Sequence, residues 1–323
     1  MPGPKILLTR RWPEEIERLL AGRYDVTLNT DDRPMTAAEL TAAFASYDIV
    51  CPTVTDPIGG DIVRAGAGRL KAICNFGAGF SHIDVKACEE AGIPLTNTPD
   101  VLTEATADIA LLLMLMVARR GGEGERQLRA GQWPGWSPTH MLGADVSGRT
   151  LGLIGYGRIA QATAKRAAHG FGMKILYNSR RRAAQAVEAE TSASYCERLE
   201  DLLAQSDFVS LHCPGGAETH HLINAERLSA MKPGAFLINT ARGTVIDEAA
   251  LIVALRERRI GGAGLDVFEK EPAVPAELVA LDNAVLLPHL GSATLETRTA
   301  MGARVVENLE AILSGREPRD RVV

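Results

Sequence analysis

The strongest constraint on the fold is an alternation of short apolar runs with segments of helical periodicity. Residues 5–9 form the first run, a helix opened by Pro13 is expected next, and residues 25–28 form the second run. Further runs of the same kind follow at residues 48–51, 71–74 and 93–96. Short buried strands that alternate with helices are typical of βαβ units. A parallel sheet is therefore predicted in this part of the chain.

The alternation restarts at residues 150–154 after a stretch of different character. Further strands, with helices between them, are expected near Ile175, Val209, Leu237, Leu265 and Leu286. The chain has 323 residues, of which 46% are hydrophobic, so it is long enough to form two cores. The prediction is an α/β protein with two domains, each containing a parallel sheet.

The segment between the two alternating regions has two parts. Residues 103–117 predict a helix that is apolar all round, and such a helix should be buried between domains or between subunits. Residues 121–147 are rich in glycine, contain Trp133 and Trp136 and lack periodicity, so we expect an arm or loop there. A final helix is expected at about residues 294–314, and it is long enough to pack on the first domain.

Charge and hydropathy favour a small-molecule partner. The 35 basic and 40 acidic side chains give a formal charge of -5 without long runs of one sign, which argues against nucleic acid or an anionic membrane as a partner. The longest apolar run, residues 109–118, is about half of the roughly 20 residues that a membrane-spanning helix needs. Met1-Pro2-Gly3-Pro4 does not resemble the start of a signal peptide, so a cytoplasmic location is expected.

The five cysteines are scattered and form neither a Cys-x-x-Cys pair nor a Cys/His zinc spacing. We therefore expect reduced, mostly buried thiols and no metal site.

A glycine-rich sequence follows the strand at residues 150–154 and opens a helix. It reads Gly155-Tyr156-Gly157-Arg158-Ile159-Ala160. In a dinucleotide-binding turn, the first glycine permits the tight turn, the second lets the backbone approach a pyrophosphate, and the small third residue allows close packing. The amides at the helix N-terminus would then donate to the phosphates. The alternative, a plain tight turn, is disfavoured by the strand and helix on either side.

The end of the next strand predicts which nicotinamide cofactor is preferred. An aspartate there would bind the adenosine ribose and repel a 2′-phosphate, but the chain has the neutral Asn178. Ser179 can donate a hydrogen bond, and Arg180 or Arg181 can pair with a phosphate. NADP(H) is therefore favoured, and NAD(H) remains open. The alternative is that these arginines bind no phosphate and are only solvated. A helix N-terminus disfavours cations, which argues against this alternative.

Several further motifs, in order, resemble those of the D-2-hydroxyacid dehydrogenase family. They are Asn75-Phe76-Gly77-Ala78-Gly79-Phe80, Asn97-Thr98-Pro99, Glu104-Ala105-Thr106-Ala107-Asp108, Leu211-His212-Cys213-Pro214, Leu237-Ile238-Asn239-Thr240-Ala241-Arg242-Gly243, Gly264-Leu265-Asp266-Val267-Phe268-Glu269-Lys270-Glu271-Pro272 and Pro288-His289-Leu290-Gly291-Ser292. Within the family, the chain is most similar to the glyoxylate and hydroxypyruvate reductases, several of which prefer NADPH.

The resemblance implies a domain organisation and an assembly. A flavodoxin-like, discontinuous substrate domain would comprise residues 1–99 and 288–323. An NAD(P)-binding Rossmann domain, residues 100–287, would be inserted into it. Family members are typically homodimers joined through the Rossmann domains, so Trp133 or Trp136 would approach the active site of the partner subunit.

The resemblance also implies the roles of three catalytic residues. Arg242 would bind the carboxylate and carbonyl oxygen of a small 2-oxo acid through its guanidinium donors. His289 would be the general acid in reduction, since imidazole exchanges its proton near neutral pH. Glu271 would orient His289, although Glu269 lies only two residues away; the spacing to Pro272 favours Glu271.

Other residues are expected, by the same resemblance, to contact the ligands. The backbone amides near Ala78 and Gly79 would hold the substrate carboxylate, and Asp266 would bind the nicotinamide carboxamide. The remaining expected cofactor contacts are Thr106, Cys213, Pro214, Thr219, Thr240, Ala241, His289 and Gly291.

Other functions remain open at this point. A broader 2-ketoacid reductase of the phenylpyruvate type is the main alternative, because the width of the pocket depends on residues 51–54, Phe80 and Trp136. A cofactor-sensing corepressor is disfavoured because Arg242, Glu271 and His289 are all present. Formate dehydrogenase-like chemistry is disfavoured by a glutamate, rather than glutamine, at position 271, and phosphoglycerate dehydrogenase by Asn178.

Overall fold

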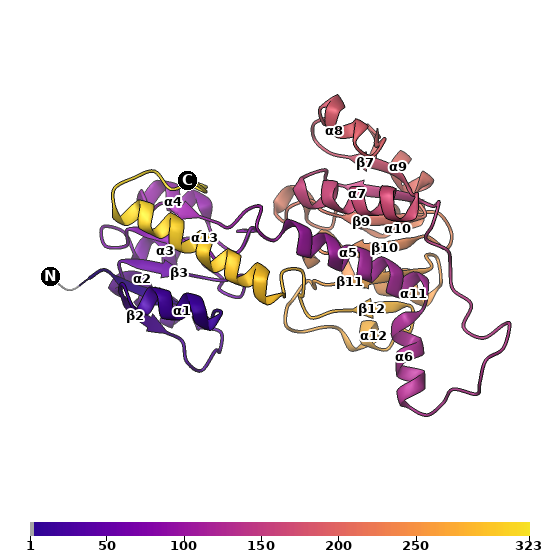
Figure 1. Ribbon diagram of the computed structural model, residues 1–323, viewed down its shortest axis with the longest axis horizontal. Helices are drawn as coiled ribbons and strands as arrows, with labels where there is room; N and C mark the ends of the chain where they lie inside the picture. Colours follow the sequence, from indigo (N-terminus) through magenta and orange to yellow (C-terminus); the bar gives the residue numbers. More distant parts are fainter. Residues whose placement is uncertain (1–2) are drawn as a thin grey trace. The chain divides into compact units, whose positions relative to one another are not determined.

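The structure is a computed structural model that describes residues 3–323 (Figure 1). Met1 and Pro2, which belong to the segment compared above with a signal peptide, lie outside the described residues. The chain forms two compact units, Met1–Leu102 with Ser292–Val323 and Thr103–Gly291. The boundaries follow residues 102 and 291, a few residues later than the expected limits of 99 and 287.

The first unit contains a five-stranded parallel sheet in the order β2-β1-β3-β4-β5. Its strands are β1 (Lys5–Leu8), β2 (Asp25–Leu28), β3 (Ile49–Cys51), β4 (Ala72–Cys74) and β5 (Leu95–Thr96). Its helices are α1 (Glu14–Ala21), α2 (Ala37–Ser46), α3 (Gly60–Ala65), α4 (Val85–Ala91) and α13 (Leu295–Leu313). This strand order is that of flavodoxin-like folds.

Alternate residues of β1, β3 and β4 face opposite layers of helices. Ile6 and Leu8 belong to a core with α1 and α13, whereas Leu7 packs with α2, α3 and α4. Helix α13 approaches α1 closely at Gly302, where an added Cβ atom would lie 2.8 Å from the Ile16 side chain. The final helix therefore completes the core of the first unit, as its length suggested.

The second unit contains a seven-stranded parallel sheet in the order β12-β11-β10-β9-β6-β7-β8. Its strands are β6 (Thr150–Ile154), β7 (Lys174–Asn178), β8 (Ser194–Tyr195), β9 (Phe208–Leu211), β10 (Phe236–Asn239), β11 (Gly262–Leu265) and β12 (Ala284–Leu286). Its helices are α5 (Thr103–Ala118), α6 (Gly121–Arg129), α7 (Arg158–Phe171), α8 (Gln185–Ala189), α9 (Leu199–Gln205), α10 (Ala225–Ala230), α11 (Glu248–Arg256) and α12 (Ala276–Val279), with 3-10 turns η1 (Ala217–Thr219) and η2 (Gly243–Val245).

Two hydrophobic cores cover the two faces of this sheet. Helices α5 and α7 pack on one face (Figure 1), and α9, α10 and α11 pack on the other. The strand order reverses between β6 and β9, as in doubly wound dinucleotide-binding folds. The predicted α/β fold with two parallel sheets is confirmed.

The segment after α5 differs in part from the expectation. An arm or loop was expected over residues 121–147, but Gly121–Arg129 forms α6. This expectation was wrong because three glycines in nine residues weaken the helical signal. None of the residues of α6 is buried. Beyond α6 the expectation holds, since residues 130–147 form neither helix nor strand, and Trp133 and Trp136 are 55% and 83% exposed.

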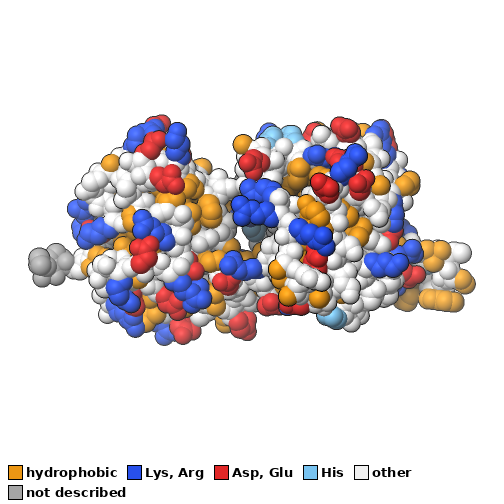
Figure 2. All heavy atoms as spheres, turned by 90° about the horizontal axis from the view of Figure 1, so that it is seen from above, with side chains coloured by type: hydrophobic (Ala, Val, Ile, Leu, Met, Phe, Trp, Pro, Cys, Tyr) orange, Lys and Arg blue, Asp and Glu red, His pale blue; other side chains and the backbone are white. Residues whose placement is uncertain are grey.

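Helix α5 buries one side against its own sheet and leaves the other partly open. Ala110, Leu113 and Met114 are fully buried, whereas Leu112 is 42% exposed. No helix among the described residues is long and apolar enough to cross a membrane. On the face shown in Figure 2, acidic and basic side chains are interspersed over both units.

Candidate active site

The glycine-rich turn joins β6 to α7 at the carboxyl end of its strand. Gly155 has a φ of 83°, and an added Cβ atom would lie 2.8–2.9 Å from the backbone of His212 and Cys213. Only glycine fits at this position. At Gly157 no atom lies within 4 Å of an added Cβ, and no side chain caps α7. The first amides of α7 are therefore available to an anion.

The other residues of the turn have different surroundings. The side chain of Tyr156 is buried and stacks on Tyr177, with 4.0 Å between the ring centroids. Tyr156 can therefore offer only its backbone to a ligand. Arg158 is exposed and Ile159 is half-buried in the first turn of α7.

At the end of β7, the side chain of Asn178 is already engaged. Its Nδ2 donates to the carbonyl oxygens of Cys196 and Glu197, at 2.9 and 3.1 Å. The Ser179 hydroxyl donates to the Arg181 carbonyl at 2.6 Å. Arg180 lies 3.4 Å from the Glu218 carboxylate, and both side chains are at least 80% exposed. The cations of this segment are thus accessible to an anionic ligand.

The neighbouring Arg182 has a different task. Its guanidinium donates to both carboxylate oxygens of Glu188 at 2.9 Å, and the Tyr177 hydroxyl donates to the same carboxylate at 2.5 Å. These hydrogen bonds, that of Arg182 first, lower the pKa of Glu188 to about 2. Arg182 therefore fixes the segment that follows β7 and is not free to bind a phosphate.

Two of the expected catalytic side chains form a direct hydrogen bond. His289 Nδ1 lies 2.8 Å from Glu271 Oε2, and Glu271 Oε1 accepts the backbone N–H of Phe268 at 3.0 Å. Burial raises the pKa of Glu271, but the hydrogen bond and charge of His289 outweigh it and hold this pKa below its ordinary value. Glu271 is therefore an ionised partner that can orient the imidazole.

Arg242 lies in the turn that follows β10. Asn239 shapes this turn: its side chain accepts the Ala241 N–H and donates to the Arg242 carbonyl, both at 2.9 Å. An added Cβ atom on Gly243 would lie 1.9 Å from the backbone of Phe268, so only glycine lets the Arg242 turn pack against the loop that carries Glu271. Burial lowers the pKa of Arg242, and the charge of Glu271 opposes this shift.

Asp266 holds the loop that carries His289. Its carboxylate accepts the backbone N–H groups of Leu290 and Gly291, at 2.6 and 2.7 Å, and the His289 N–H donates to the Asp266 carbonyl at 2.9 Å. The Thr106 hydroxyl donates to the Gly291 carbonyl at 3.1 Å. Thr106 and Asp266, both expected to contact a cofactor, thus also position the His289 loop.

The remaining expected cofactor residues lie on the loops after β9 and β10. The Thr219 hydroxyl donates to the carbonyl of the exposed Pro214 at 2.7 Å. Burial raises the pKa of the Cys213 thiol to about 11, so it is not a nucleophile near neutral pH. The buried Thr240 hydroxyl, next to Ala241, has no hydrogen-bond partner among the described residues. This hydroxyl and the open amides of α7 fit a dinucleotide ligand.

The first unit has its own candidate binding loop after β4. Asn75 Nδ2 donates to the carbonyls of Gly77 and Gly79, and Asn97 Nδ2 donates to the carbonyl of Ala78 at 2.7 Å. The backbone N–H groups of Ala78 and Gly79 donate no hydrogen bond within the described part of the chain. The loop therefore presents donors that suit a carboxylate.

Two structural roles have only a weak signal in the sequence. Asn239 and Gly243 are part of a recognised motif, but their support of Arg242 depends on contacts with Ala241 and Phe268. An asparagine three residues before an Arg-Gly pair does indicate a side-chain-stabilised turn. The contact between Gly243 and Phe268 joins residues that are far apart in the sequence, so no local sequence pattern predicts it.

A sheet of this kind binds dinucleotides at the point where its strand order reverses. The hydrogen-bonded pair of His289 and Glu271, a candidate proton donor and its partner, lies on the loops that follow β12 and β11 of the same sheet. The class of protein is therefore an NAD(P)-dependent dehydrogenase.

Comparisons with known proteins support this class. The family model described as D-isomer specific 2-hydroxyacid dehydrogenase, NAD binding domain, matches residues 111–291. A glyoxylate reductase from Thermococcus onnurineus is 46% identical over 319 residues, which cover 98% of this chain and 94% of that protein. The chain belongs to the D-isomer specific 2-hydroxyacid dehydrogenase family, which confirms the resemblance noted in the sequence.

Solved structures agree with this assignment. A putative D-isomer specific 2-hydroxyacid dehydrogenase from Polaromonas sp. JS6 66 has a TM-score of 0.92 at 39% identity, and the match covers all of both chains. An NADPH-dependent glyoxylate/hydroxypyruvate reductase from Sinorhizobium meliloti, in complex with NADP and malonate, has a TM-score of 0.88 at 36% identity, over 99% of this chain and 97% of that chain.

Proposed function

We propose that this protein reduces small 2-oxo acids, glyoxylate and hydroxypyruvate, to 2-hydroxy acids with NADPH as the preferred hydride donor. The observation that carries the proposal is the hydrogen bond between His289 and an ionised Glu271 at strand ends of a dinucleotide-binding sheet. The printed names of similar proteins, glyoxylate reductase and NADPH-dependent glyoxylate/hydroxypyruvate reductase, support the substrate class.

The chain's own residues divide the chemistry as follows. A bound reduced nicotinamide supplies the hydride that adds to the carbonyl carbon of the substrate. Arg242 binds the substrate carboxylate and polarises the carbonyl oxygen. His289 gives its Nε2 proton to the oxygen as negative charge develops there, and Glu271 keeps the ring oriented through Nδ1. A 2-hydroxy acid and a neutral imidazole result, and the imidazole takes up a proton from solvent.

We assign the two units different tasks. Thr103–Gly291 is the cofactor domain, an assignment supported by the match of the NAD-binding family model to residues 111–291. The other unit is the substrate domain, and the free amides of Ala78 and Gly79 hold the substrate carboxylate. Asp266, Thr106, Pro214 and Thr240 surround the nicotinamide.

The preference for NADPH rests on the end of β7. Asn178 cannot repel a 2′-phosphate, and the exposed Arg180 and Arg181 can pair with it. Glu218 opposes this preference, since its carboxylate lies 3.4 Å from Arg180 and the pair would have to separate before Arg180 could bind the phosphate. NADH remains a usable second cofactor in this proposal.

The assembly we propose is a cytoplasmic homodimer joined through the second unit. Support comes from the large exposed apolar side chains of α5 and of the segment that follows it, which a partner subunit would cover: Leu112, Leu128, Trp133, Trp136 and Leu142. The five cysteines, all free thiols, suit a reducing compartment.

The deciding experiment is a comparison of kcat/KM for NADPH and NADH oxidation with glyoxylate, hydroxypyruvate and phenylpyruvate. We expect NADPH with the two small acids to give the highest values. A preference for NADH would refute the roles of Ser179, Arg180 and Arg181. A preference for phenylpyruvate would replace the proposed substrate class with that of a broader 2-ketoacid reductase, and no turnover with any acid would favour a cofactor-sensing protein.

A further inference from the structure

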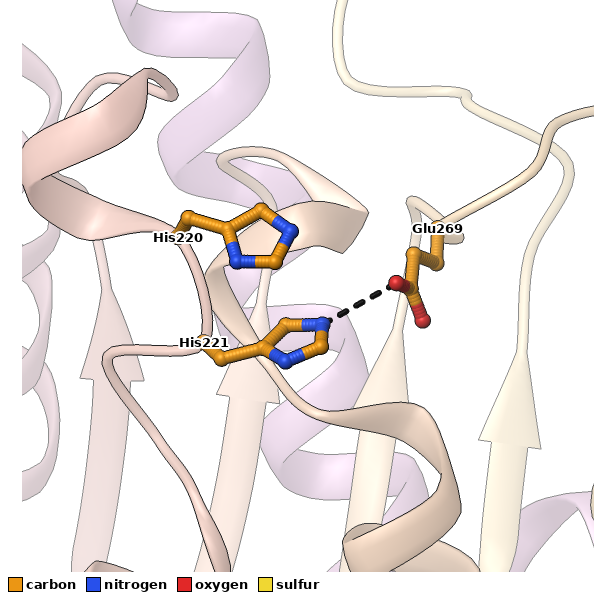
Figure 3. Close-up of side chains that lie close together, drawn as sticks. All are labelled: His220, His221 and Glu269. Carbon is orange, nitrogen blue, oxygen red and sulfur yellow. Dashed lines mark hydrogen bonds and ion pairs between the residues drawn. The ribbon is translucent and has the colours of Figure 1, made fainter.

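Three side chains that the proposed reaction does not use converge on the surface of the second unit. They are His220, His221 and Glu269, and one donor atom from each lies within 4.8 Å of the other two. Figure 3 shows the two imidazole rings one above the other, with the Glu269 carboxylate on the side toward which His221 Nε2 points. We propose that these residues form a binding site for a divalent transition-metal ion of the Zn²⁺ type.

The backbone conformation brings the two rings together. Side chains of consecutive residues in extended backbone point in opposite directions. Here His220 is extended, but His221 has a φ of 49°, in the left-handed region that few residues other than glycine adopt. As a result the rings stack with 3.9 Å between their centroids. Unusual backbone conformations of this kind are concentrated at functional sites.

Both segments that carry the three residues are held in place by the rest of the unit. The His221 N–H donates to the Thr244 carbonyl at 2.8 Å, which ties the pair of histidines to η2. The Glu269 N–H donates to the carboxylate of Glu248 at 2.7 Å. Because the backbone of both segments is already ordered, the binding of an ion would cost little conformational entropy.

The spacing of the donor atoms suits a small ion. His221 Nε2 lies 3.0 Å from Glu269 Oε1. Two tetrahedral ligands at the usual zinc distances of about 2.0–2.1 Å are roughly 3.4 Å apart, so this pair needs only a small separation to admit the ion. His220 is exposed, so its ring can turn toward the ion without disturbing the core.

The donor set selects the class of metal. Two imidazoles and one carboxylate are typical ligands of Zn²⁺ and of neighbouring transition metals, whereas Mg²⁺ and Ca²⁺ prefer oxygen atoms throughout. Three protein ligands would leave the remaining coordination positions to water. The cysteine spacing gives no sign of such a site, because its ligands are two histidines and a glutamate, and His221 and Glu269 are 48 residues apart with no short motif linking them.

The test is direct titration of the untagged protein with Co²⁺ and Zn²⁺. We expect one equivalent of Co²⁺ to give visible absorption bands of low-symmetry coordination, which one equivalent of Zn²⁺ removes. Isothermal titration should give the same stoichiometry. His220→Asn and Glu269→Gln should each weaken binding by at least about 10–100-fold, the loss that follows removal of a group that only orients a metal ligand.

A matched control is His169→Ala, which removes an exposed histidine of α7 and should leave the titration unchanged. The proposal is overturned if the wild-type protein shows no saturable binding, which would leave only the His221–Glu269 hydrogen bond. It is also overturned if the variants bind as the wild type does. Because the readout is metal binding and not turnover, failure here and failure of the proposed reductase activity are separate results.

Discussion

The surroundings of Glu271 stabilise its negative charge, whereas those of His289 fix the position of its ring. Glu271 stays ionised although it is more than half removed from solvent, because His289 and the Phe268 N–H stabilise its negative charge. His289 has a φ of 54°, and its loop is held by Asp266. The ring is thus fixed by its backbone and by its hydrogen bond to Glu271, as the proposed role of proton donor requires.

Replacement of His289 should separate catalysis from cofactor binding. Asparagine tolerates the left-handed backbone better than alanine does, so His289→Asn should keep the loop intact. We expect kcat to fall by on the order of 10²–10⁴, while the NADPH dissociation constant, measured by fluorescence titration, stays unchanged. Near-normal turnover would show that another group supplies the proton.

The double variant Arg180→Ala/Arg181→Ala should affect one cofactor only. Loss of the charge-assisted contacts to the 2′-phosphate should raise KM for NADPH at least about tenfold, corresponding to one such hydrogen bond. KM for NADH, which lacks that phosphate, serves as the internal control and should not change. Equal losses with both cofactors would contradict the assigned role.

At the scale of elements, the turns at the ends of β6, β7, β10, β11 and β12 carry the site. Their motifs could be predicted from the sequence because parallel strands all place their carboxyl ends at one edge. Helix α6 was missed because its glycines hide its periodicity. The proposed metal site has no signal in the sequence either, because its candidate ligands come from separate loops that meet only in the tertiary fold.

The segment after β7 should lose stability in acid in a defined range. The pKa of Glu188 is lowered from 4.5 to about 2, so the stability it contributes is present above pH 4.5 and is lost as the pH falls to about 2. Glu188→Gln should therefore lower Tm at pH 7, and the gap to wild type should narrow over that range. Glu190→Gln, which removes only a surface ion pair with Lys165, is the control. A gap that is independent of pH would refute this origin.

Two glycine-to-alanine substitutions should have opposite effects. Gly243→Ala places a Cβ atom 1.9 Å from the Phe268 backbone and should cost at least about 4 kcal/mol or prevent folding. Gly170→Ala, in α7 with no atom within 4 Å of the new Cβ, should stabilise by about 0.5–1 kcal/mol. Urea unfolding measures both, and comparable stabilities of the two variants would show that the Gly243 contact is not required.

At the scale of the whole molecule, the restart of the strand and helix pattern predicts a second α/β region. The point at which the chain returns to the first unit has no such signal, because residues 288–295 contain neither a long linker nor a change in composition. The first unit resumes at Ser292 because α13 packs against α1 and β4, and this contact joins distant parts of the chain.

Assembly can be tested through the exposed tryptophans. If a partner subunit covers residues 130–147, Trp133→Ser/Trp136→Ser should shift the mass in light scattering toward that of a monomer and make activity depend on protein concentration. The single variant Leu295→Ser, at an exposed position in the first unit, is the control. A wild-type monomer at all concentrations would refute the proposed dimer.

The division of the chain also affects the order in which its two units can fold during synthesis. Every residue of Thr103–Gly291 precedes α13, so the second unit can fold while the nascent chain is still growing. In the first unit, the layer that packs on Ile6, Leu8 and Cys74 is incomplete until Val305 and Leu309 have left the ribosome. We therefore expect the segment translated first to reach its native state last, and to expose apolar surface that chaperones can bind until then.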